Sequence, residues 1–537
     1  MVNKFAKKLW RQRVNELLTK ELINEEQKDR LVEMINSPDL ENFTLVLSII
    51  KIMLKEKLSE DLNEGQKNAF EKITEFMDNE LRADAIVLKG YAGTGKTFLV
   101  KKIIEFIVQT SQTDKVAIAA PTNKAVQVLY ANSAVNHNNS EMYIFEDLFE
   151  SEHRLLYTTV HKLLGLKEVI NDQGQQNFVI DKINDCTLSD YSCLIVDEVS
   201  MLDDKICHDI MKFASKMPII FMGDPAQIPP IHKTDSLPFK KGTAYNFETV
   251  ELTEIMRQKG KHPIIDASFI LRDNLTKTQP IPVIKTDLKD GKGIIHLDAK
   301  TDLDKVRPLL KKYFDSPEFK ANPDYMKVIG WRNKSIAYIN GIVREILYGE
   351  NPPKFVVGEK LITNKPVFEK VRQKYGKNTY ENWKILCHTS EEFSIAGIEL
   401  TLKAFQEGPY THTMQMYKLE IIGKSEGEEV FSTIYVVHED AKEEYEKFLA
   451  GLKMQAVKSR TASFWVNYYN ALKWSANLAY NYAITAHKSQ GSTYNNVLIL
   501  ENDIDANNKV VERNRIKYTS YTRATDLLYV LKENTNE

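Results

Sequence analysis

A glycine-rich segment between a short apolar strand and a helix most constrains how this chain can fold. Residues 90–97 read GYAGTGKT, follow the apolar run AIVL and precede the helix-like run FLVKKIIEFI. Gly90, Gly93 and Gly95 allow the backbone to curl, so that successive N–H groups face a phosphate at the N-terminus of the next helix. A chance glycine turn would not need these flanks. The segment therefore predicts an α/β fold with a phosphate-binding loop.

Three side chains of this loop have the chemistry that a nucleotide requires. Lys96 supplies a cation for the outer phosphates, and Thr97 supplies a hydroxyl for magnesium, while Thr94 belongs to the cradle itself. Downstream, the run LIVDEVSM places Asp197 at a strand end, where it can hold magnesium through water. The adjacent Glu198 can orient and deprotonate an attacking water. Two acids after a strand are commonly solvated turn residues, but about 100 residues after a phosphate loop they form a convincing pair.

Two further segments supply candidate catalytic groups. In GDPAQIPP, Gln227 is a candidate sensor of the terminal phosphate. In LTEIMRQ, Arg257 follows a short apolar run. A lone arginine is usually a surface charge, yet an arginine that reaches the γ-phosphate stabilises the transition state by about 10³–10⁵ in rate.

Composition limits the class of protein. A chain of 537 residues predicts three to four domains at roughly 150 residues each. Hydrophobic residues at 43% and charged residues at 27% exclude a disordered or fibrous chain. Lysine plus arginine is 72 and aspartate plus glutamate is 74, a net charge of −2, so the surface is not uniformly basic. The four cysteines form no CxxC pair, which favours free thiols in a reducing cytoplasm. No apolar run has membrane-spanning length.

The chain is organised as two α/β parts with insertions. Residues 1–60 predict helices, and apolar strand-like runs occur at 85–90, 115–120, 193–198, 218–223, 326–331 and 496–501. Residues 355–440 predict shorter strands with turn signals. The segment GLKEVINDQGQQNFVIDKI predicts a hairpin with an NDQGQQN turn. Between Glu446 and Glu501 no acid occurs, while lysines and aromatics alternate, which favours a polyanion on part of that surface; packing of the aromatics is the alternative.

Nine segments occur in a fixed order along the chain. They are LNEGQKNAF, GYAGTGKT, AAPTNKAVQVL, TTVHKLLG, IVDEVSM, GDPAQIPP, LTEIMRQ, AITAHKSQG and YTSYTRA, and they extend over about residues 62–530. This series resembles the motif series of superfamily 1 helicases, and within it the 5′-to-3′ branch, superfamily 1B, that includes RecD, Pif1 and the phage Dda helicase. The layout is most similar to that of Dda-like members.

The resemblance implies an α/β fold of two RecA-like parallel-sheet motor domains. The first carries a β-hairpin insertion, and the second carries a β-rich, SH3-like and helical insertion. The expected boundaries are a helical extension at 1–60, a first motor domain at 61–260 with a wedge hairpin at about 166–185, a second motor domain at 261–355 and 484–537, and an inserted domain at 356–483. The implied activity is ATP-dependent unwinding of DNA with magnesium as cofactor.

The resemblance also implies roles for individual residues. Gln66 would read the adenine edge, Arg523 would be a second arginine finger, and Gln490 and Gly491 would line the nucleotide cleft. The implied contacts to single-stranded DNA are Pro121, Thr122, Lys124, Thr159, His161, Trp331, Asn333, Thr485, His487 and Lys488. Phe178 occupies a position similar to that of the family's wedge aromatic and would stack on the last base pair. For each residue expected to contact the single strand, a role in loop structure or as a helix cap is an equal alternative. For Trp331 and Phe178 the alternative is ordinary packing.

The implied partners are single-stranded DNA and forked duplex DNA, with replication or recombination proteins through residues 1–60 or the inserted domain. The protein is expected to act as a monomer in the cytoplasm, which is the host cytoplasm if a phage encodes it, without a membrane partner. Two other classes share part of the pattern. A translocase that strips proteins from single strands would have every motif, and a non-motor phosphate-loop ATPase would lack Arg523 and the strand-binding segments. RNA is a less favoured substrate.

Overall fold

The structure is a computed structural model of the whole chain. It describes residues 11, 14, 15, 18, 23–36, 40–79, 81–110, 115–133, 155–180, 186–230, 233–254, 262–277, 284–299, 303–375, 378–407, 410–425 and 428–533. Among the described residues, no helix combines the length and the apolar character needed to span a membrane. All four cysteines are buried and free.

The first half of the chain is built on a six-stranded parallel sheet of order β3-β2-β6-β7-β1-β8. Its strands are β1 (Ala85–Gly90), β2 (Val116–Ala120), β3 (Leu155–Thr159), β6 (Cys193–Val196), β7 (Ile219–Gly223) and β8 (Phe247–Leu252). The central strands are short, apolar and buried along nearly their whole length, because helices cover both faces of the sheet. The phosphate loop follows β1, which lies between β7 and β8.

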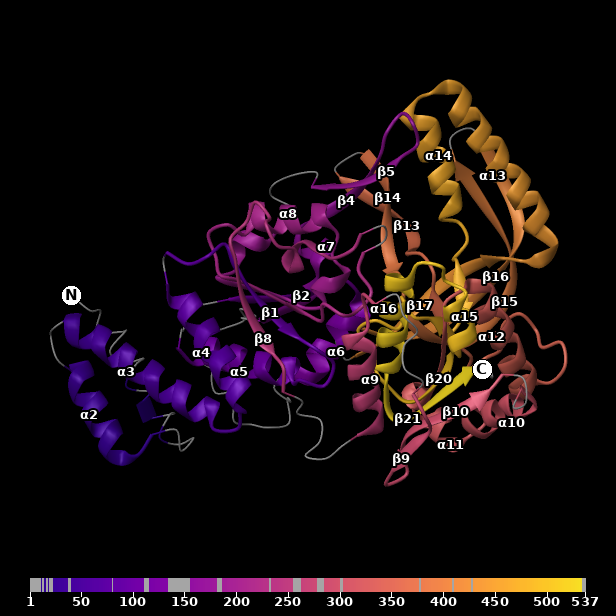
Figure 1. Ribbon diagram of the computed structural model, residues 1–537. Coiled ribbons are helices and arrows are strands. Elements are labelled where there is room, and N and C mark those ends of the chain that lie inside the picture. The colour runs from indigo at the N-terminus through magenta and orange to yellow at the C-terminus, as the bar shows by residue number, and fades with distance from the viewer. Residues whose placement is uncertain are drawn as a thin grey trace.

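Helices cover this sheet, and α2 and α3 continue the helical layer towards the N-terminus (Figure 1). They are α2 (Glu25–Asn36), α3 (Leu40–Ser59), α4 (Glu64–Asp78), α5 (Lys96–Thr110), α6 (Asn123–Ser133), α7 (Val160–Leu163) and α8 (Asp204–Phe213). Leu31 of α2 and Val46 and Leu54 of α3 belong to the same buried cluster as Ile103 and Ile107 of α5. The N-terminal helices therefore share the core of the first sheet.

A second six-stranded sheet has the order β19-β11-β20-β21-β10-β9. It contains β9 (Asp287–Lys289), β10 (Lys292–Asp298), β11 (Met326–Gly330), β19 (Ala483–Thr485), β20 (Tyr494–Leu500) and β21 (Ala524–Lys532), and all pairs are parallel except β9 with β10. Its helices are α9 (Pro263–Asp273), α10 (Leu303–Phe314), α11 (Pro317–Ala321), α12 (Asn333–Tyr348), α15 (Glu501–Asp505) and α16 (Val510–Tyr521). Two parallel-sheet units confirm the predicted α/β fold class.

Between β11 and β19 the chain forms a separate β-rich region with two helices. A five-stranded sheet, β17-β16-β15-β12-β18, consists of β12 (Lys360–Thr363), β15 (Glu392–Glu407), β16 (Tyr410–Ser425), β17 (Glu428–Val437) and β18 (Leu478–Tyr480). Beside it lie the pair β13 (Val367–Tyr375) and β14 (Asn378–Cys387) and the helices α13 (Glu439–Ser459) and α14 (Ala462–Leu472). The prediction of shorter strands is wrong here, because β15 and β16 each have 16 residues. Their ladder continues across one register shift at Ile395/Gly397.

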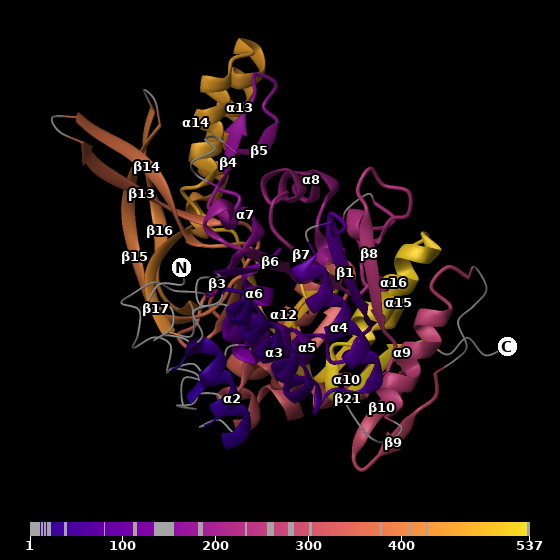
Figure 2. The same cartoon turned by 90° about the vertical axis from the view of Figure 1, so that its left-hand side faces the viewer.

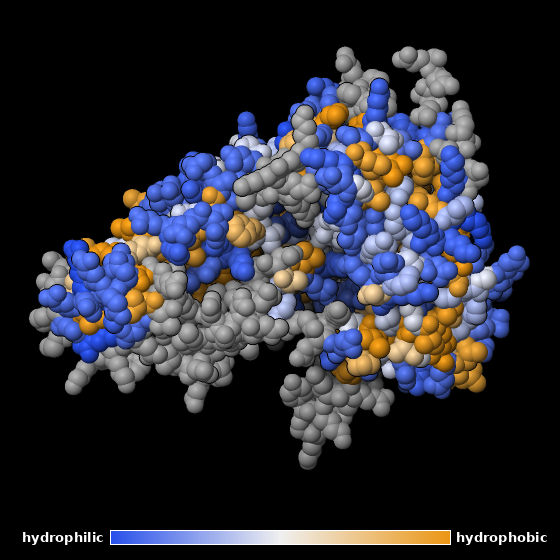
Figure 3. Space-filling model, turned by 90° about the horizontal axis from the view of Figure 1, so that it is seen from below, coloured by the Kyte–Doolittle hydropathy of each residue, from blue (hydrophilic) through white to orange (hydrophobic). Residues whose placement is uncertain are grey.

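A hairpin leaves the first unit and reaches the inserted region. Strands β4 (Leu166–Ile170) and β5 (Gln176–Ile180) pair antiparallel, with the turn at 171–175. Figures 1 and 2 show its tip beside α14 from two directions. Seen from below, the surface is mostly hydrophilic and is hollowed between the two halves of the chain (Figure 3).

Candidate nucleotide-binding and strand-binding site

The phosphate loop has a backbone that requires its glycines. Gly93 and Gly95 have φ values of 83° and 78°, in the left-handed region that favours glycine. At Gly90, a Cβ atom would lie 2.7 Å from Thr94 Oγ1 and 2.8 Å from Lys96 Cγ, too close for any side chain. The loop therefore closes tightly on itself immediately before α5, which begins at Lys96.

The polar groups of the loop are engaged with the loop itself. Lys96 Nζ donates to the carbonyl oxygens of Gly90 (2.6 Å) and Tyr91 (3.3 Å). Thr94 Oγ1 also donates to Tyr91 O, at 2.9 Å. Thr97 is partly exposed on the first turn of α5. A phosphate would thus have to draw the ammonium group of Lys96 away from its own carbonyls.

The two carboxylates follow β6 directly and are desolvated. Glu198 has φ 51°, and its backbone N–H donates to Asp197 Oδ1 at 2.7 Å. Burial raises the pKa of Asp197 to about 7, and the neighbouring Glu198 adds to this, while Lys96 opposes it. Burial also raises the pKa of Glu198, against Arg523 and Lys96. Glu198 Oε2 is buried without a hydrogen-bond partner among the described residues.

These carboxylates fit a divalent cation. A buried carboxylate oxygen without a donor, next to a second carboxyl whose pKa is raised, is a site where added positive charge restores the ionised form. The glycine cradle of the loop fits the phosphates of a nucleotide, because a Cβ at Gly90 would fill it. Thr97 and Asp197 remain the residues predicted to hold magnesium.

The second half of the chain reaches this site through α16. Arg523, only 4% exposed, donates through Nε to Thr519 O (2.9 Å) and through Nη1 to Ser492 O (2.9 Å). Its charge acts on Glu198, because it lowers the pKa of that carboxyl. The arginine predicted from the sequence is therefore held rigidly by its own unit, with its charge directed across the boundary between the halves.

Two residues of α16 that the sequence interpretation missed connect the halves at this site. Tyr518 Oη donates to Asp224 Oδ2 at 2.7 Å and accepts from Ala92 N of the phosphate loop at 3.3 Å. Arg515 donates to the carbonyl oxygens of Pro225 (3.1 Å) and Gln227 (3.2 Å) and pairs with Asp235 at 2.7 Å. Tyr518 and Arg515 lie five and eight residues before Arg523 in α16, so their position on that helix was the available signal.

The predicted glutamines have internal partners. Gln66 is fully buried and forms a capping box with Asn63 at the start of α4, while its Nε2 donates to Thr94 O at 3.2 Å. Gln490 Nε2 donates to Ile228 O at 2.9 Å, across the boundary between the halves. Gln227 is buried, and its Oε1 has no partner among the described residues.

Gly491 marks a close approach of the two halves. Its φ is +73°, and a Cβ there would lie 3.1 Å from the Cβ of Ala125 in α6. The residue predicted to line the nucleotide cleft therefore lies where the second unit packs against a helix of the first.

The strand-binding residues of the first half lie at the carboxyl ends of β2 and β3. Thr122 Oγ1 accepts from Ala125 N at 3.2 Å, and Thr159 Oγ1 accepts from Lys162 N at 3.3 Å, so both cap a helix. Pro121 precedes Thr122 at the end of β2 and is partly exposed. Burial lowers the pKa of His161.

Among the residues predicted to contact the single strand, Lys124 is already held by two carboxylates. Its Nζ lies 3.3 Å from Glu392 and 3.6 Å from Asp324, in a partly buried cluster that joins α6 to the second half. Although burial opposes it, the charges of Lys124 and Lys327 hold the pKa of Glu392 below its usual range. A phosphate would have to compete with these two carboxylates for Lys124.

The remaining strand-binding candidates lie at the same edge of the second sheet. Trp331 and Asn333 follow β11, where the backbone N–H of Trp331 donates to Asp503 Oδ2 at 2.6 Å and Asn333 is exposed. Thr485 ends β19, and Lys488 Nζ donates to Asn364 Oδ1. Burial lowers the pKa of both His487 and Lys488.

Two predicted residues cannot be placed in full. Arg257 lies outside the described residues, and for Phe178 the structure describes the backbone, which pairs with Glu168 in the hairpin, but not the side chain.

The hairpin tip is fixed to α14 by its backbone. Tyr469 Oη donates to Gly174 O at 2.7 Å, and Asp172 Oδ1 accepts from Ala462 N at 2.8 Å. Gly174 lies against the indole of Trp465, where a Cβ would be only 2.5 Å from two ring atoms. Aromatics of the acid-free stretch thus serve in packing here.

Comparison with known proteins relates this chain to a family. Residues 61–296 match the model of an AAA domain, and residues 480–531 match that of a UvrD-like helicase C-terminal domain. The ATP-dependent DNA helicase Dda of Enterobacteria phage T4 is 28% identical over 316 residues, which cover 58% of this chain and 62% of that protein. The RecBCD enzyme subunit RecD of Buchnera aphidicola subsp. Schizaphis graminum is 23% identical over 477 residues, 83% of this chain and 70% of that one. By these matches the chain resembles the superfamily 1B helicases of the RecD and Dda type.

A chain of similar extent occurs in a mimivirus. The uncharacterized protein R530 of Acanthamoeba polyphaga mimivirus is 25% identical over 512 residues, which cover 87% of this chain and 99% of that protein. In the present chain, the helicase C-terminal match contains β19, β20 and Arg523, and the AAA match contains the phosphate loop and both carboxylates. The two matched segments are therefore the ones that supply the groups gathered around the loop.

Proposed function

We propose that this protein is an ATP-dependent DNA helicase that moves 5′-to-3′ on single-stranded DNA and unwinds forked duplexes. One observation carries the proposal. The phosphate loop of one parallel-sheet unit is contacted by Tyr518 of the other unit, and the carboxylate Glu198 beside the loop is influenced by the charge of Arg523, also from the other unit. A site built from two halves that can separate suits conversion of nucleotide turnover into movement.

The residues of the site have distinct roles in this proposal. Lys96 moves from the carbonyl oxygens of its loop to the outer phosphates, and the backbone N–H groups of the loop hold the inner ones. Glu198 orients the attacking water and accepts its proton, for which a raised pKa suits it. Arg523, with Arg257 from the first half, neutralises charge on the transferred phosphate. Magnesium, held by Thr97 and Asp197, would supply positive charge against the phosphate oxygens.

Movement follows from the contacts between the halves. Gln490, Arg515 and Tyr518 all bond to groups of the first unit near the site, so a change at the phosphate loop alters contacts that fix the second unit. Closure and opening would alternate the grip of the loops after β2 and β3 with that of the loops after β11 and β19. The 5′-to-3′ direction is proposed from the resemblance of the chain to the superfamily 1B helicases.

Lys96→Ala tests the chemistry. We expect it to abolish DNA-stimulated ATP hydrolysis and to leave binding of single-stranded DNA within about twofold. Lys102→Ala is a matched control on the same helix, where Lys102 pairs with Asp61. Full hydrolysis by the Lys96 variant would show that this loop is not the nucleotide site.

Forked substrates test direction and substrate together. Unwinding of DNA with a 5′ tail, and none with a 3′ tail, is expected, and RNA forks are expected to be opened poorly. Removal of a bound protein from single strands without fork opening would instead assign the chain to the stripping translocases. Phe178→Ala should reduce base pairs opened per ATP while hydrolysis is spared; unchanged unwinding would remove the wedge role of that side chain.

A further inference from the structure

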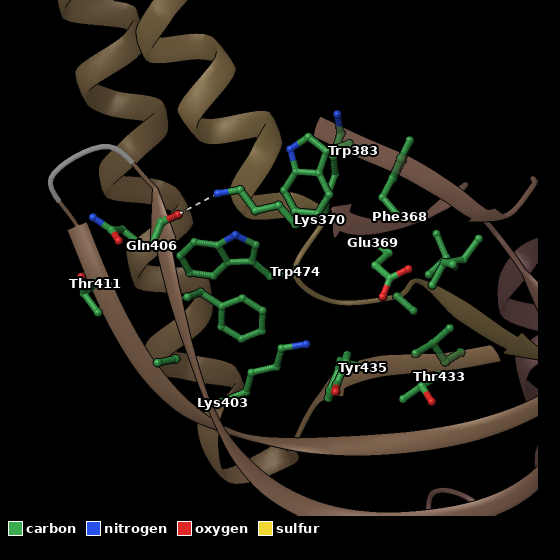
Figure 4. Close-up of a pocket in the computed structure, with 17 residues that line it drawn as sticks. Phe368, Glu369, Lys370, Trp383, Lys403, Gln406, Thr411, Thr433, Tyr435 and Trp474 are labelled. Carbon is green, nitrogen blue, oxygen red and sulfur yellow. Dashed lines mark hydrogen bonds between the residues drawn. The ribbon is translucent and has the colours of Figure 1, made fainter. Parts of the chain in front are cut away.

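A cavity lies within the inserted region, away from the phosphate loop. Its volume is about 760 Å³, and it is enclosed by β13 and β14 on one side and by β15, β16 and β17 on the other (Figure 4). The segment that follows α14 closes it with Lys473 and Trp474. A cavity of this size is within the range of small-ligand sites.

Lysine side chains lie over aromatic rings inside the cavity. Lys403 Nζ is 3.0 Å from the centroid of the Tyr435 ring. Lys473 Nζ is 4.6 Å from the centroid of Phe368 and 5.6 Å from that of Trp383. Figure 4 shows Lys403 and Tyr435 at the floor and Trp383 and Phe368 on the β13–β14 side. Cation–π contacts of this kind keep ammonium groups ordered without cancelling their charge.

The charge of the cavity is positive. Among its 17 lining residues there are three lysines, Lys370, Lys403 and Lys473, and one carboxylate, Glu369. Burial lowers the pKa of Lys403 to about 8, and Glu369 only partly offsets this. An anion placed beside Lys403 would stabilise the charged form of this lysine, which burial disfavours. The cavity therefore favours a negatively charged ligand.

The aromatic wall is rigid. Trp474 is 3% exposed and stacks on Phe405 with a centroid distance of 4.6 Å and an interplanar angle of 12°. Its other neighbour, Phe448, is stacked at 5.3 Å and 19°. Because both neighbours stack on its faces, the ring of Trp474 is fixed and only its edge can face the cavity; a planar ligand would stack instead on Trp383 or Phe368, over which Lys473 now lies.

The cavity is joined to the hairpin by one helix. Ala462 and Tyr469 of α14 bind the hairpin turn, and the same helix ends at Leu472, next to Lys473. Its 11 residues extend over about 16 Å. Nucleic acid that has passed the hairpin would therefore lie within a few nucleotides of the cavity.

We infer that this cavity binds one nucleotide unit of a single-stranded nucleic acid, with its phosphate at the lysines and its base against the aromatic rings. The base replaces an ammonium group over Trp383 or Phe368, and that ammonium group meets the phosphate. Hydroxyl and amide groups of Thr433 and Gln406 are available in the lining for the base edge. An acidic peptide would use the lysines but not the flat rings, whereas stacking of a base on an aromatic ring adds about 1–3 kcal/mol.

Photo-crosslinking of the full-length protein tests this site. An oligonucleotide with 5-iododeoxyuridine is irradiated with the protein, and the adducts are mapped by mass spectrometry. We expect adducts on Trp383, Phe368 or Tyr435. Lys403→Gln and Lys473→Gln should each lower the yield there about tenfold and flatten the dependence of log K on log salt by about 0.7, the loss of one phosphate contact. Lys447→Gln, on the exposed face of α13, is the charge-matched control.

Competition experiments distinguish a site for free nucleotides from a site for a nucleotide within a strand. Competition by free dAMP as well as by the oligonucleotide supports a site that takes single nucleotides, and competition by the oligonucleotide alone supports a strand site. Adducts confined to residues outside the cavity would overturn the inference, as would stronger competition by poly-glutamate than by DNA. The inference rests on the proposed binding of single-stranded DNA, but its test is separate from that of the proposed chemistry, since crosslinking needs no ATP hydrolysis and is unaffected by failure of the Lys96→Ala test.

Discussion

Gly174→Ala should separate strand opening from ATP hydrolysis. Gly174 has φ +76° in the turn between β4 and β5, and a methyl group on it would lie 2.5 Å from Trp465 Cδ2 and Cε2. Ordinary contact is about 3.5–4.0 Å. Trp465 is 8% exposed and packs against Tyr468 and Tyr469, so its ring has little room to move aside. The hairpin would therefore leave α14.

The cost of leaving follows from the contacts that are lost. The bond from Tyr469 Oη to Gly174 O contributes about 1 kcal/mol, and the bond from Ala462 N to the charged Asp172 contributes about 1.5–3 kcal/mol. Together they amount to roughly 2–4 kcal/mol, which corresponds to a shift of the docked population by about 30- to 1000-fold. Separately, an alanine in the left-handed region adds about 1–2 kcal/mol of backbone strain.

Gly291→Ala isolates the contact from the strain. Gly291 has φ +77° in the turn between β9 and β10, and nothing lies within 4 Å of a Cβ built there. In single-turnover unwinding of a 5′-tailed fork, we expect Gly174→Ala to open several-fold fewer base pairs per ATP, with hydrolysis within about twofold. Hydrogen exchange at 166–180 should rise. Wild-type unwinding by this variant would refute the reasoning, and an equal defect in Gly291→Ala would assign the effect to strain.

Other consequences of the buried charges can be measured directly. Asp197→Asn should stabilise the nucleotide-free protein at pH 8 by up to about 4 kcal/mol, because the pKa of Asp197 is about 7 in the folded protein against an ordinary value of 3.8. The free-energy cost of ionising Asp197 in the folded protein grows between pH 4 and 7. The stability gained by the variant, measured by urea denaturation, should therefore vanish near pH 4. Lys124→Met should destabilise by about 1–3 kcal/mol, and a double-mutant cycle with Glu392→Gln should recover part of the loss; strictly additive effects would contradict the pairing. Lys403, with a pKa of about 8, should be acetylated at pH 8 about tenfold faster than Lys418, whose pKa is raised by Glu399; equal rates would contradict its burial.

Strands of both parallel sheets were predictable where a short apolar run is buried on two faces. β1, β2, β6, β7 and β11 lie within the runs predicted from the sequence, and β20 begins two residues before its run. The strands β3, β8, β9, β10, β19 and β21 lie outside those runs. The strands of the inserted region follow different physics. β15 and β16 have one exposed face, so polar residues alternate with apolar ones over 16 residues and the pattern contains no clear end. Shorter strands were inferred there from the turn signals in residues 355–440.

Prediction from the sequence identified the residues of the site but not the groups to which they bind. The spacing of the phosphate loop identifies Lys96, yet that its ammonium group binds Gly90 O is a property of the folded loop. The capping box of Asn63 and Gln66 is readable in the sequence, three residues apart at a helix start. The bond from Tyr518 to Asp224 joins residues almost 300 positions apart, and no local pattern indicates it.

Several of the groups expected to bind nucleotide and DNA are satisfied by the protein itself in this structure: Lys96 binds loop carbonyls, Gln66 caps a helix and Lys124 pairs with Glu392. Tyr518 likewise accepts from an N–H of the phosphate loop. A buried polar group without a partner costs about 1–3 kcal/mol, so these internal bonds stabilise the protein before any ligand arrives. Ligands must then exchange for them. Because Tyr518 and Glu392 belong to the second half of the chain, exchange at the phosphate loop or at α6 breaks bonds between the halves. Binding is thereby coupled to a rearrangement of the contacts between the halves without any additional moving part.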